Sequence, residues 1–508
     1  MRQANFGYIL RKKSYYHPDS VAIVEQTTRD EHTYGKLERR SNSIARALAD
    51  RGIGQGDRVC GLFRNSIEFF ELFFATCKLG AVIAPFNYRL SPDELDYLTG
   101  DVEPDLYVFE SVFEETVKHL SLDGVQTVRI GSPSEERVDA DPWDGFYEFD
   151  SAELSIADGF DDPAVLLYTS GSTGRPKGVP LSHKNLFFSS VSYVVDAQLS
   201  ADDVTVTSSP IFHVGGLNIF TLPLLHVGGT VVLQQEFDPE EAWEILEAYD
   251  VTKTFAIPTM LNAMVDVEGW REHDLSALEL VVGGGEPVPS ELKRQFDSID
   301  VQCVAAYGLT ETTDGSLMLR PEHAMEKPPK CNGQTFTHVD AKVVDESGAE
   351  CGPGESGELL HRGPTVADGY LGLPEKTAEV WDDDGWFHTG DIAEVDEDGF
   401  YHIHGRLDDM IISGGENIYP SEVEEALYSH PDVTGAVVFG VPDSEWGEVV
   451  TAVVATTDGK EISEEALRSF LESRLARFKH PKRVEFVEDL PTSGTGKIER
   501  QAVVERHT

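Results

Sequence analysis

A run of glycine and hydroxyl residues at positions 168–179 is the strongest chemical signal in the sequence, and it reads YTSGSTGRPKGV. Glycines leave backbone N–H groups open to a ligand, serine and threonine add short O–H donors, and Lys177 adds a positive charge. Such groups bind a polyphosphate, although their spacing does not match the P-loop motif GxxxxGK[ST]. The residues that we expect to contact phosphates are Thr169, Ser170, Gly171, Ser172, Thr173, Gly174 and Lys177.

Two later segments place further polar groups directly after predicted strands. Residues 283–287, GGGEP, follow a strand at 280–282, at the carboxyl end where α/β sheets bind ligands. Residues 307–312, YGLTET, follow a strand at 301–307 and combine an aromatic face with the Thr310 hydroxyl and the Glu311 carboxylate. Because Mg²⁺ prefers carboxylate and phosphate oxygens, Glu311 is a candidate metal ligand.

Together these segments resemble the signatures of the adenylate-forming superfamily, which comprises acyl-CoA and aryl-CoA synthetases, nonribosomal adenylation domains and luciferases. Further segments match in the family's order. They are FHVGG at 212–216, WFHTGD at 386–391, GRLDD at 405–409, SGGENIYP at 413–420 and PTSGTGKI at 491–498. The resemblance covers roughly residues 20–502.

The resemblance implies a nucleotide site with defined roles. Thr169 and Glu311 would hold Mg²⁺, Tyr307 would face adenine, and Asp391 would accept both ribose hydroxyls. Besides the loop 169–174, the implied ATP-binding residues are Lys177, Gly285, Glu286, Pro287, Tyr307, Gly308, Thr310, Asp391, Arg406 and Lys497. The residues implied in catalysis are Lys497, Lys177, Thr310, Glu311 and His213.

The resemblance also implies where the acid and coenzyme A bind. The acid would contact His213, Gly215, Gly283 and Gly284, with His213 either a gate to the acyl tunnel or part of the acceptor pocket wall. Asp408 would be the hinge about which a small domain rotates between two half-reactions. The residues implied to line the pantetheine channel are Ser413, Gly414 and Gly415.

The implied chemistry needs no general base, because a carboxylate is already ionised near neutral pH. The protein has to neutralise charge on the attacked phosphorus and on leaving pyrophosphate. The resemblance therefore implies an AMP-forming acyl-CoA ligase that uses ATP, Mg²⁺ and coenzyme A. It would adenylate a medium- or long-chain fatty acid or an aryl acid and then form the CoA thioester.

Several alternatives stay open. An adenylation enzyme that loads a carrier protein, a ligase of the o-succinylbenzoate type, a luciferin-oxidising enzyme and a nucleotide sensor with an inactive site share these motifs. The glycines at 283–285 leave room for a long chain or a flat ring. No lysine or arginine lies at 213–220, which disfavours a dicarboxylate, and Asn417 stands where several long-chain relatives carry tryptophan.

The elements that must position these residues alternate between strands and helices. Apolar runs predict strands buried on both faces of a parallel sheet at 59–63, 81–86, 164–168, 230–233, 251–257, 280–282 and 301–307. A helix is predicted at 66–79, and capping signals predict helix starts at Ser91, Asp238 and Ser421. After Gly405 a βα pattern predicts helices at 422–430 and 464–478 and strands at 436–441, 449–456 and 484–487.

These elements predict an α/β fold in more than one domain, because 508 residues exceed one compact core. We expect a large N-terminal domain at 1–405, built of parallel βαβ subdomains and a small β-barrel-like subdomain at about 333–405, where glycines and turns are frequent. A mobile α+β C-terminal domain at 406–508 would follow.

Charge and composition restrict the partners and the compartment. Ninety acidic against 41 basic residues leave a net charge of −49, which would repel nucleic acids and anionic lipid surfaces and which suggests a haloarchaeal, salt-rich cytoplasm. A merely acidic mesophilic enzyme is the alternative. Five cysteines without a CxxC pair predict buried reduced thiols. Without a signal peptide or an 18-residue apolar run, we expect a cytoplasmic protein with no integral membrane association. Its partners would be the small acid and CoA, and a homodimer is left open.

Overall fold

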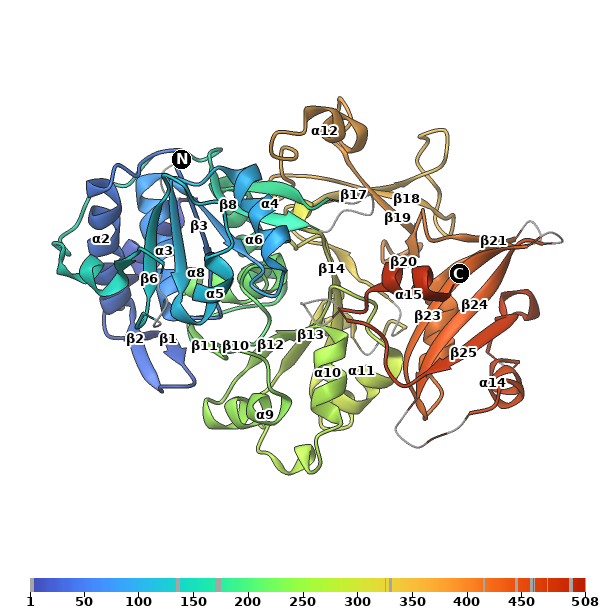
Figure 1. Cartoon of the computed structure of the whole chain (residues 1–508). Helices are drawn as coiled ribbons and strands as arrows, with labels where there is room; N and C mark the ends of the chain where they lie inside the picture. Colours follow the sequence, from blue (N-terminus) through green and yellow to red (C-terminus); the bar gives the residue numbers. More distant parts are fainter. Residues whose placement is uncertain are drawn as a thin grey trace.

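The computed structural model of the chain consists of a large α/β body and a smaller C-terminal lobe (Figure 1). The body holds three mixed sheets and one antiparallel sheet, and the lobe holds a fifth sheet. The residues that the structure describes are 4–133, 138–169, 175–324, 326–328, 331–413, 416–443, 446–456, 460, 462–472, 474–492 and 497–507.

The largest sheet has seven strands in the order β7-β6-β5-β3-β4-β8-β9 and is parallel except for the last pair. Its strands are β3 (Arg58–Leu62), β4 (Val82–Phe86), β5 (Leu106–Glu110), β6 (Gln126–Ile130), β7 (Asp141–Pro142), β8 (Pro163–Thr169) and β9 (Lys177–Ser182). Helices α3 (Ile67–Leu79) and α4 (Pro92–Val102) connect its parallel strands, as the alternating sequence pattern predicts.

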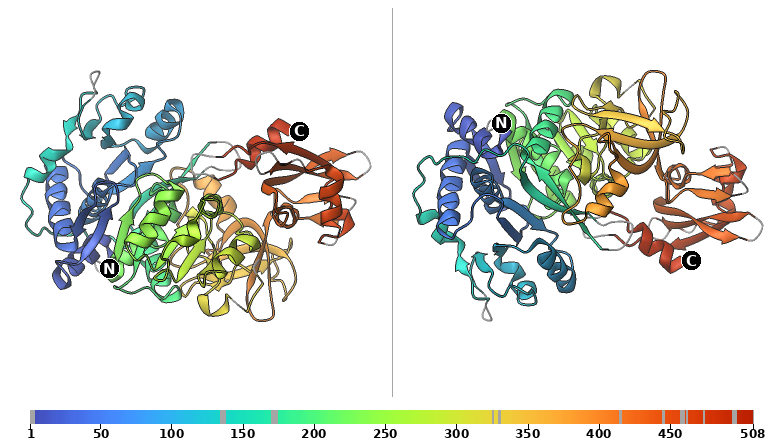
Figure 2. Two further views of the ribbon diagram at one scale, coloured as in Figure 1. Left: turned by 90° about the horizontal axis from the view of Figure 1, so that it is seen from below. Right: turned by 90° about the horizontal axis from the view of Figure 1, so that it is seen from above.

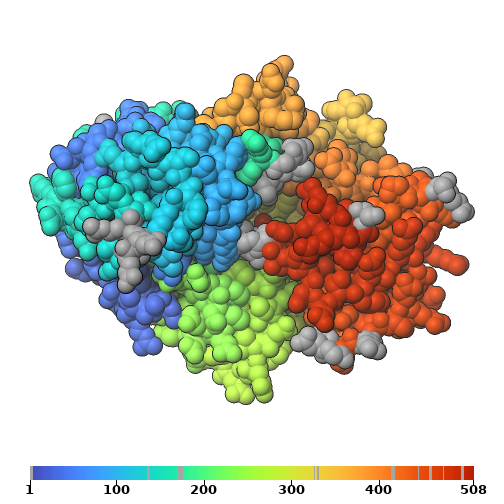
Figure 3. Space-filling model, in the orientation of Figure 1, coloured from blue at the N-terminus to red at the C-terminus, as the bar shows by residue number. Residues whose placement is uncertain are grey.

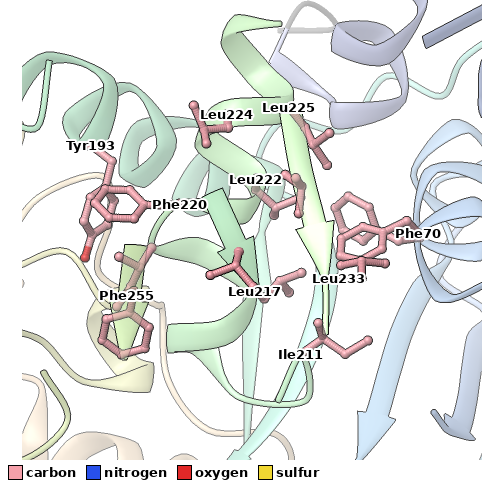
Figure 4. Close-up of a cluster of buried hydrophobic side chains, with 14 of the residues drawn as sticks. Phe70, Tyr193, Ile211, Leu217, Phe220, Leu222, Leu224, Leu225, Leu233 and Phe255 are labelled. Atoms are coloured by element: carbon pink, nitrogen blue, oxygen red, sulfur yellow. The ribbon is translucent and has the colours of Figure 1, made fainter. Parts of the chain in front are cut away.

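A second sheet has the order β10-β11-β1-β2, with strands β1 (Val21–Glu25), β2 (Asp30–Thr33), β10 (Val204–Thr207) and β11 (Thr230–Leu233). Helices around these sheets include α1 (Phe6–Tyr16), α2 (Tyr34–Asp50), α6 (His183–Asp196), α7 (Val214–Asn218) and α8 (Thr221–Val227). Figure 4 shows the buried side chains where α6, α7 and α8 meet β11, among them Tyr193, Phe220 and Leu233.

A third sheet carries the strands after which two of the motifs lie. Its order is β12-β13-β14-β15-β16, with β12 (Lys253–Ala256), β13 (Leu280–Gly283) and β14 (Gln302–Tyr307) parallel and β15 (Leu317–Met318) and β16 (Gln334–Thr335) antiparallel. Helices α9 (Pro239–Ala248), α10 (Pro258–Val265) and α11 (Ser290–Asp297) accompany it. The parallel strands of the body thus belong to three separate sheets.

The glycine-rich stretch forms a four-stranded antiparallel sheet of β17 (Asp340–Val344), β18 (Gly357–Arg362), β19 (Phe387–Val395) and β20 (Tyr401–Arg406). Its β-rich character is as predicted, but it also contains a helix, α12 (Pro374–Val380). The sequence pattern does not predict this helix because turn glycines are frequent around it, although Pro374 stands at its first position.

The C-terminal lobe has its own core. Its elements are β21 (Ile411–Ser413), β22 (Glu416–Ile418), α13 (Pro420–Tyr428), β23 (Val433–Asp443), β24 (Gly447–Thr456), α14 (Glu464–Leu471), β25 (Arg483–Val487) and α15 (Arg500–His507). Two clusters of buried apolar side chains are built from residues between Ile411 and Val504. Figure 2 shows the lobe at one end of the molecule in both views.

Some local predictions are confirmed and others are wrong. Ser91 caps α4 with a complete capping box, and Asp238 caps α9. Ser421 does not cap α13: the helix begins at Pro420, one residue earlier, and the Ser421 hydroxyl donates to the carbonyl of His404 instead. The predicted helix at 464–478 ends at Leu471, and a 3₁₀ turn follows at Arg477–Lys479.

The five cysteines are all unpaired thiols. Four of them are buried as expected, but Cys351 is half-buried because it lies in a surface turn of the antiparallel sheet. Within the described part of the chain, no helix combines the length and the apolar character needed to cross a bilayer.

Candidate active site

The phosphate-binding run lies between two strands of a hairpin. Strand β8 ends at Thr169 and β9 begins at Lys177, and these two residues pair across the antiparallel ladder. Ser170, Gly171, Ser172, Thr173 and Gly174 lie outside the described residues. Ser182 then caps α6 in a capping box with Asn185. The sequence correctly places a strand before the run and a capped helix after it, but β9 intervenes, so the hairpin fixes both ends of the run.

Tyr370 connects the lysine of this run to Glu311. The Lys177 Nζ lies 4.6 Å from the centre of the Tyr370 ring. The Tyr370 hydroxyl donates to Glu311 Oε1 over 2.8 Å, and Glu311 is buried in the 3₁₀ turn Thr310–Thr312. Burial, reinforced by the Glu311 charge, raises the pKa of Tyr370, so its hydroxyl remains a donor. Lys177 and Glu311, which the sequence analysis named separately as candidate catalytic residues, therefore contact the same tyrosine.

The residues present fit a Mg²⁺ ion that arrives with its nucleotide. Mg²⁺ is commonly bound by one or two carboxylates together with substrate phosphates and water. Glu311 supplies one such carboxylate, and the half-buried Thr169 stands at the end of β8. Among the described residues, no group of three or more histidine, cysteine, aspartate or glutamate side chains forms a metal cage. The fit is thus to a metal held largely by phosphate oxygens.

Asp391 lies between a tyrosine and an arginine. Asp391 on β19 and Arg406 on β20 are direct neighbours in the ladder, and Arg406 Nε lies 2.8 Å from Asp391 Oδ1. The Tyr307 hydroxyl donates to Asp391 Oδ2. Burial raises the pKa of Asp391, while Arg406 and the Tyr307 hydroxyl oppose the shift. A carboxylate has about four lone-pair sites, so Asp391 can still accept from ribose hydroxyls.

Each glycine of the motif after β13 is required for a different reason. A β-carbon on Gly283 would lie 2.6 Å from a methyl of Val288. On Gly284 it would lie 3.1 Å from the Ala306 carbonyl oxygen and 3.4 Å from the Phe255 ring. Gly285 has a φ of +83° and faces the end of the Lys497 side chain. These glycines allow close approach from a strand, a ring and a cation.

Lys497 reaches this motif from the C-terminal lobe. Its neighbour Ile498 donates its backbone N–H to Glu286 Oε1 over 3.1 Å. Burial raises the pKa of Glu286, and Lys497 acts in the opposite direction. The Ser290 hydroxyl donates to Glu425 beside this contact. In the space-filling view the lobe lies against the middle part of the chain (Figure 3). The contact of Lys497 with Gly285 places this lysine at the predicted nucleotide motif.

His213 is held as a neutral ring. It precedes α7, and its Nε2 is buried without a hydrogen-bond partner among the described residues. Burial lowers the pKa of His213 to about 3, and the charges of Lys497 and Arg89 contribute. Two residues on, a β-carbon at Gly215 would lie 3.0 Å from the Phe255 ring. His213 therefore presents its uncharged Nε2, and it lies close enough to Lys497 for the lysine charge to act on it.

Other predicted residues lie elsewhere. Ser413 is buried in β21, where it pairs with Glu416 and Gly447, and Figure 1 places β21 well apart from β13 and β14. Gly414 and Gly415 lie outside the described residues. Asp408 is exposed in the turn after β20, and Pro287 is exposed next to Glu286. Among the described residues, the structure thus brings Lys497 to Gly285 and Asp391 to Arg406, whereas Ser413 lies apart from them.

Three residues near the site were missed by sequence reasoning. Tyr370 contacts Glu311 across 59 positions of sequence. Asp314 follows the YGLTET motif, and Tyr193 lies within α6. The Asp-Gly pair at 314–315 is a turn signal that could have drawn attention to Asp314. Nothing in the local sequence marks Tyr370 or Tyr193.

The body combines three mixed sheets with one antiparallel sheet, and a separate lobe follows it. A lysine of that lobe reaches the glycine motif after β13. These features are those of an adenylate-forming enzyme. The chain belongs to the AMP-binding enzyme family: residues 10–371 match this family and residues 422–497 match the AMP-binding enzyme C-terminal domain. This membership confirms the resemblance read from the motifs.

Relatives cover the whole chain. A feruloyl-CoA synthase of Amycolatopsis sp. is 41% identical over 498 residues, 98% of each chain, and an indoleacetate–CoA ligase of Aromatoleum aromaticum is 35% identical over 93% of this chain and 92% of its own. Among solved structures, ATP-bound MatB from Rhodopseudomonas palustris is 31% identical with a TM-score of 0.87, and each chain is 99% covered. The anthranilate CoA ligase AuaEII in complex with anthranoyl-AMP is 26% identical with a TM-score of 0.91, covering 99% of this chain and 97% of its own. The predicted fold class is confirmed.

Proposed function

We propose that this protein is an AMP-forming acyl-CoA ligase. It adenylates a carboxylic acid with ATP, releases pyrophosphate, and transfers the acyl group to coenzyme A with release of AMP. The observation that carries the proposal is the position of Lys497 against Gly285, within one site with the Asp391–Arg406 pair and Glu311. The names of the feruloyl-CoA, indoleacetate and fatty-acid ligases among its relatives support it.

In the first half-reaction the residues of this chain neutralise negative charge. Lys497 stabilises the charge that develops where the acid attacks the α-phosphate, and Lys177 contacts the departing phosphates. Asp391 orients the ribose, and Tyr307 and Arg406 fix the Asp391 carboxylate. Bound Mg²⁺ would supply further charge neutralisation at the phosphates, with Glu311 and Thr169 as its protein ligands. Because His213 is neutral, it can lie next to the acid without forming an ion pair with the carboxylate, which stays available to Lys497.

In the second half-reaction the C-terminal lobe has to turn. We place the domain boundary at 405/406 and the hinge at Asp408, so that residues 406–508 rotate as a unit. The separate core of the lobe supports this division. Rotation carries Lys497 away and brings Ser413, with Gly414 and Gly415, to line the pantetheine channel.

An aryl acid is the favoured substrate. Gly284 leaves room for the ring of Phe255, and the adjoining Gly285 faces Lys497, so an aromatic acid could lie against this ring. Relatives named for feruloyl and indoleacetate substrates support an aromatic acid. A second candidate function is the loading of a carrier protein, because a fatty acid–[acyl-carrier-protein] ligase of Streptomyces coeruleorubidus is 35% identical over 93% of this chain.

One assay tests both candidates. Purified protein is given ATP, Mg²⁺ and a panel of aryl and fatty acids, and pyrophosphate release and thioester formation are measured with CoA or with an acyl carrier protein. We expect pyrophosphate release with aryl acids and a thioester only when CoA is present. Thioester formation on the carrier protein alone would support the second function, and failure of every acid to release pyrophosphate would contradict both.

A further inference from the structure

Asp314 is a carboxylate in an unusual setting beside the acid site. Its Oδ2 is buried and has no hydrogen-bond partner among the described residues. The side chain as a whole is only half-buried, so another part of it remains accessible. Burial raises the pKa of Asp314 to about 7, although the Lys497 charge opposes the shift. An acceptor that is desolvated and unpaired is costly, which calls for an explanation.

The backbone holds this carboxylate in place. Thr313 and Asp314 both have positive φ, +57° and +73°, a conformation that costs non-glycine residues free energy and that clusters at ligand sites. The Asp314 N–H donates to the Leu309 carbonyl over 3.0 Å, and a β-carbon on Gly308 would overlap the Asp314 carbonyl. The glycine of the YGLTET motif therefore makes room for the turn that carries Asp314.

A second unpaired polar group lies next to it. Tyr193 of α6 is fully buried, and its hydroxyl has no partner among the described residues. A β-carbon on Gly315, the residue after Asp314, would lie 3.3 Å from the Tyr193 ring, so the two groups are neighbours. Burial raises the pKa of Tyr193, and the Asp314 charge adds to the shift. The Tyr193 ring packs against Phe336 at 4.8 Å and Phe220 at 6.1 Å between ring centres.

Phe255 links this polar pair to the reacting end of the site. A β-carbon on Gly215 would lie 3.5 Å from Asp314 Oδ2 and 3.0 Å from one edge of the Phe255 ring, while one on Gly284 would lie 3.4 Å from its other edge. Gly284 adjoins Gly285, which faces Lys497. Figure 4 shows Tyr193, Phe220 and Phe255 grouped beside α7. Asp314 thus lies near one edge of the Phe255 ring, and Lys497 lies beyond its other edge, next to Gly285.

We propose that Asp314 and Tyr193 form a hydrogen-bonding subsite at the distal end of the acid site, for an aryl acid that carries a hydroxyl or amino group remote from its carboxylate. The inference rests on the proposed ligase function. Such a donor gives Asp314 the partner that the protein lacks, whereas an unsubstituted ring or a hydrocarbon chain leaves the carboxylate desolvated and unpaired. Sites built to bond a polar group discriminate strongly against analogues that lack it.

The test compares matched acids in pyrophosphate release. Cinnamate, 4-methylcinnamate, 4-hydroxycinnamate and 4-aminocinnamate differ only at the remote position. We expect kcat/KM of the wild-type protein to be about 10- to 100-fold higher for the hydroxy or amino acid than for the other two, the factor that a hydrogen bond to a charged group provides. The hydroxy and amino arms show which donor the subsite takes.

Variants locate the preference. Asp314→Gly removes the carboxylate and suits the positive φ, and it should bring the ratio of kcat/KM values to within about threefold. Tyr193→Phe removes only a buried hydroxyl and should lower the ratio of kcat/KM values about three- to tenfold. This variant also tests the subsite if Asp314→Gly does not fold. Tyr107→Phe, an equally buried tyrosine on β5 in another core cluster, is the matched control and should leave the ratio unchanged.

Each result decides between the two proposals. Equal kcat/KM for all four acids in the wild-type protein, or a preference that persists in both Asp314→Gly and Tyr193→Phe, would overturn the subsite and leave the ligase function intact. Absence of pyrophosphate release with all of these acids and with the wider panel would instead overturn the proposed function and the subsite with it.

Discussion

Lys497 and Gly285 lie so close that a β-carbon on Gly285 would be 2.9 Å from the Lys497 Nζ. The two residues come from different parts of the fold, the lysine from the C-terminal lobe and the glycine from the turn after β13. Gly285 also has a φ of +83°, so a larger residue there would be strained even without the lysine. This close approach holds Lys497 at the place where the proposed first half-reaction, adenylation of the acid, needs its charge.

The first prediction separates the two half-reactions. Lys497→Ala should slow adenylation by about 10²- to 10³-fold, the usual effect of losing one preorganised donor. Conversion of a chemically supplied acyl-adenylate and CoA to thioester should change little, because the lobe has then carried Lys497 away. Both steps can be followed by rapid quench, with Lys460→Ala as a control on the same lobe.

Asp408→Pro, which stiffens the proposed hinge, should impair the passage between the half-reactions instead. If Lys497→Ala slowed both half-reactions equally, a single static site would perform all the chemistry and the rotation would be wrong.

The second prediction concerns Asp391. Asp391→Ala removes the ribose acceptor and leaves Arg406 and the Tyr307 hydroxyl without this partner. A charge-assisted hydrogen bond is worth about 1.5–3 kcal/mol, so ATP should bind about ten- to a hundredfold more weakly, as measured by calorimetry. Asp383→Ala, an exposed aspartate nearby, is the control. Unchanged ATP affinity would reduce Asp391 to a structural role.

The third prediction is a pH dependence of stability. His361 on β18 is fully buried, neither ring nitrogen has a partner among the described residues, and burial lowers its pKa to about 3. An unfolded histidine has a pKa of about 6.5. Between these two values only the unfolded chain binds the proton, so the free energy of unfolding falls as the pH falls, by about 1.4 kcal/mol per pH unit.

His361→Phe should remove this component. The loss of unfolding free energy between pH 7.5 and pH 5, measured by urea denaturation, should be about 2 kcal/mol smaller than in the wild-type protein. His17→Phe, at an exposed position, should leave the pH dependence as it is. An identical pH dependence in wild type and His361→Phe would show that the ring takes up its proton in the native state.

The fourth prediction concerns salt. A net charge of −49 repels itself, and 1 M salt shortens the Debye length to about 3 Å. The melting temperature should therefore rise between low and molar KCl, as followed by circular dichroism. A melting temperature that stays level or falls over this range would exclude adaptation to a salt-rich cytoplasm.

Much of the fold could be predicted because its signals are local. The apolar run at 230–233 coincides with β11, and Ser91 with Glu94 forms the expected capping box. The residues proposed to bind the nucleotide could be named because they lie in short motifs that resemble those of the family, and their roles stay predictions. The sequence assigned Lys497 and Gly285 to the same proposed ATP site, but the contact between them comes from the structure alone.

The rest depends on contacts that sequence spacing does not encode. Ser421 bonds to His404 because β20 runs past the start of α13, which a capping pattern cannot foresee. Tyr370 holds Glu311 from a loop before α12. The positive φ of Asp314 and its unpaired oxygen arise from the packing of Gly308, Tyr193 and Gly215 around it.

The hydrogen bonds between the lobe and the body influence which orientation of the lobe is populated. The bonds from Ile498 to Glu286 and from Ser290 to Glu425 are hydrogen bonds at a surface that water can reach once the lobe departs. Because both acceptors are carboxylates, exchanging such bonds for bonds to water changes the free energy by about 1.5–3 kcal/mol each. Two orientations of the lobe can then be close in energy, and a ligand with a few kcal/mol of preference for one of them decides which is populated. ATP and acyl-adenylate would then select the orientation of the lobe through their own binding preference.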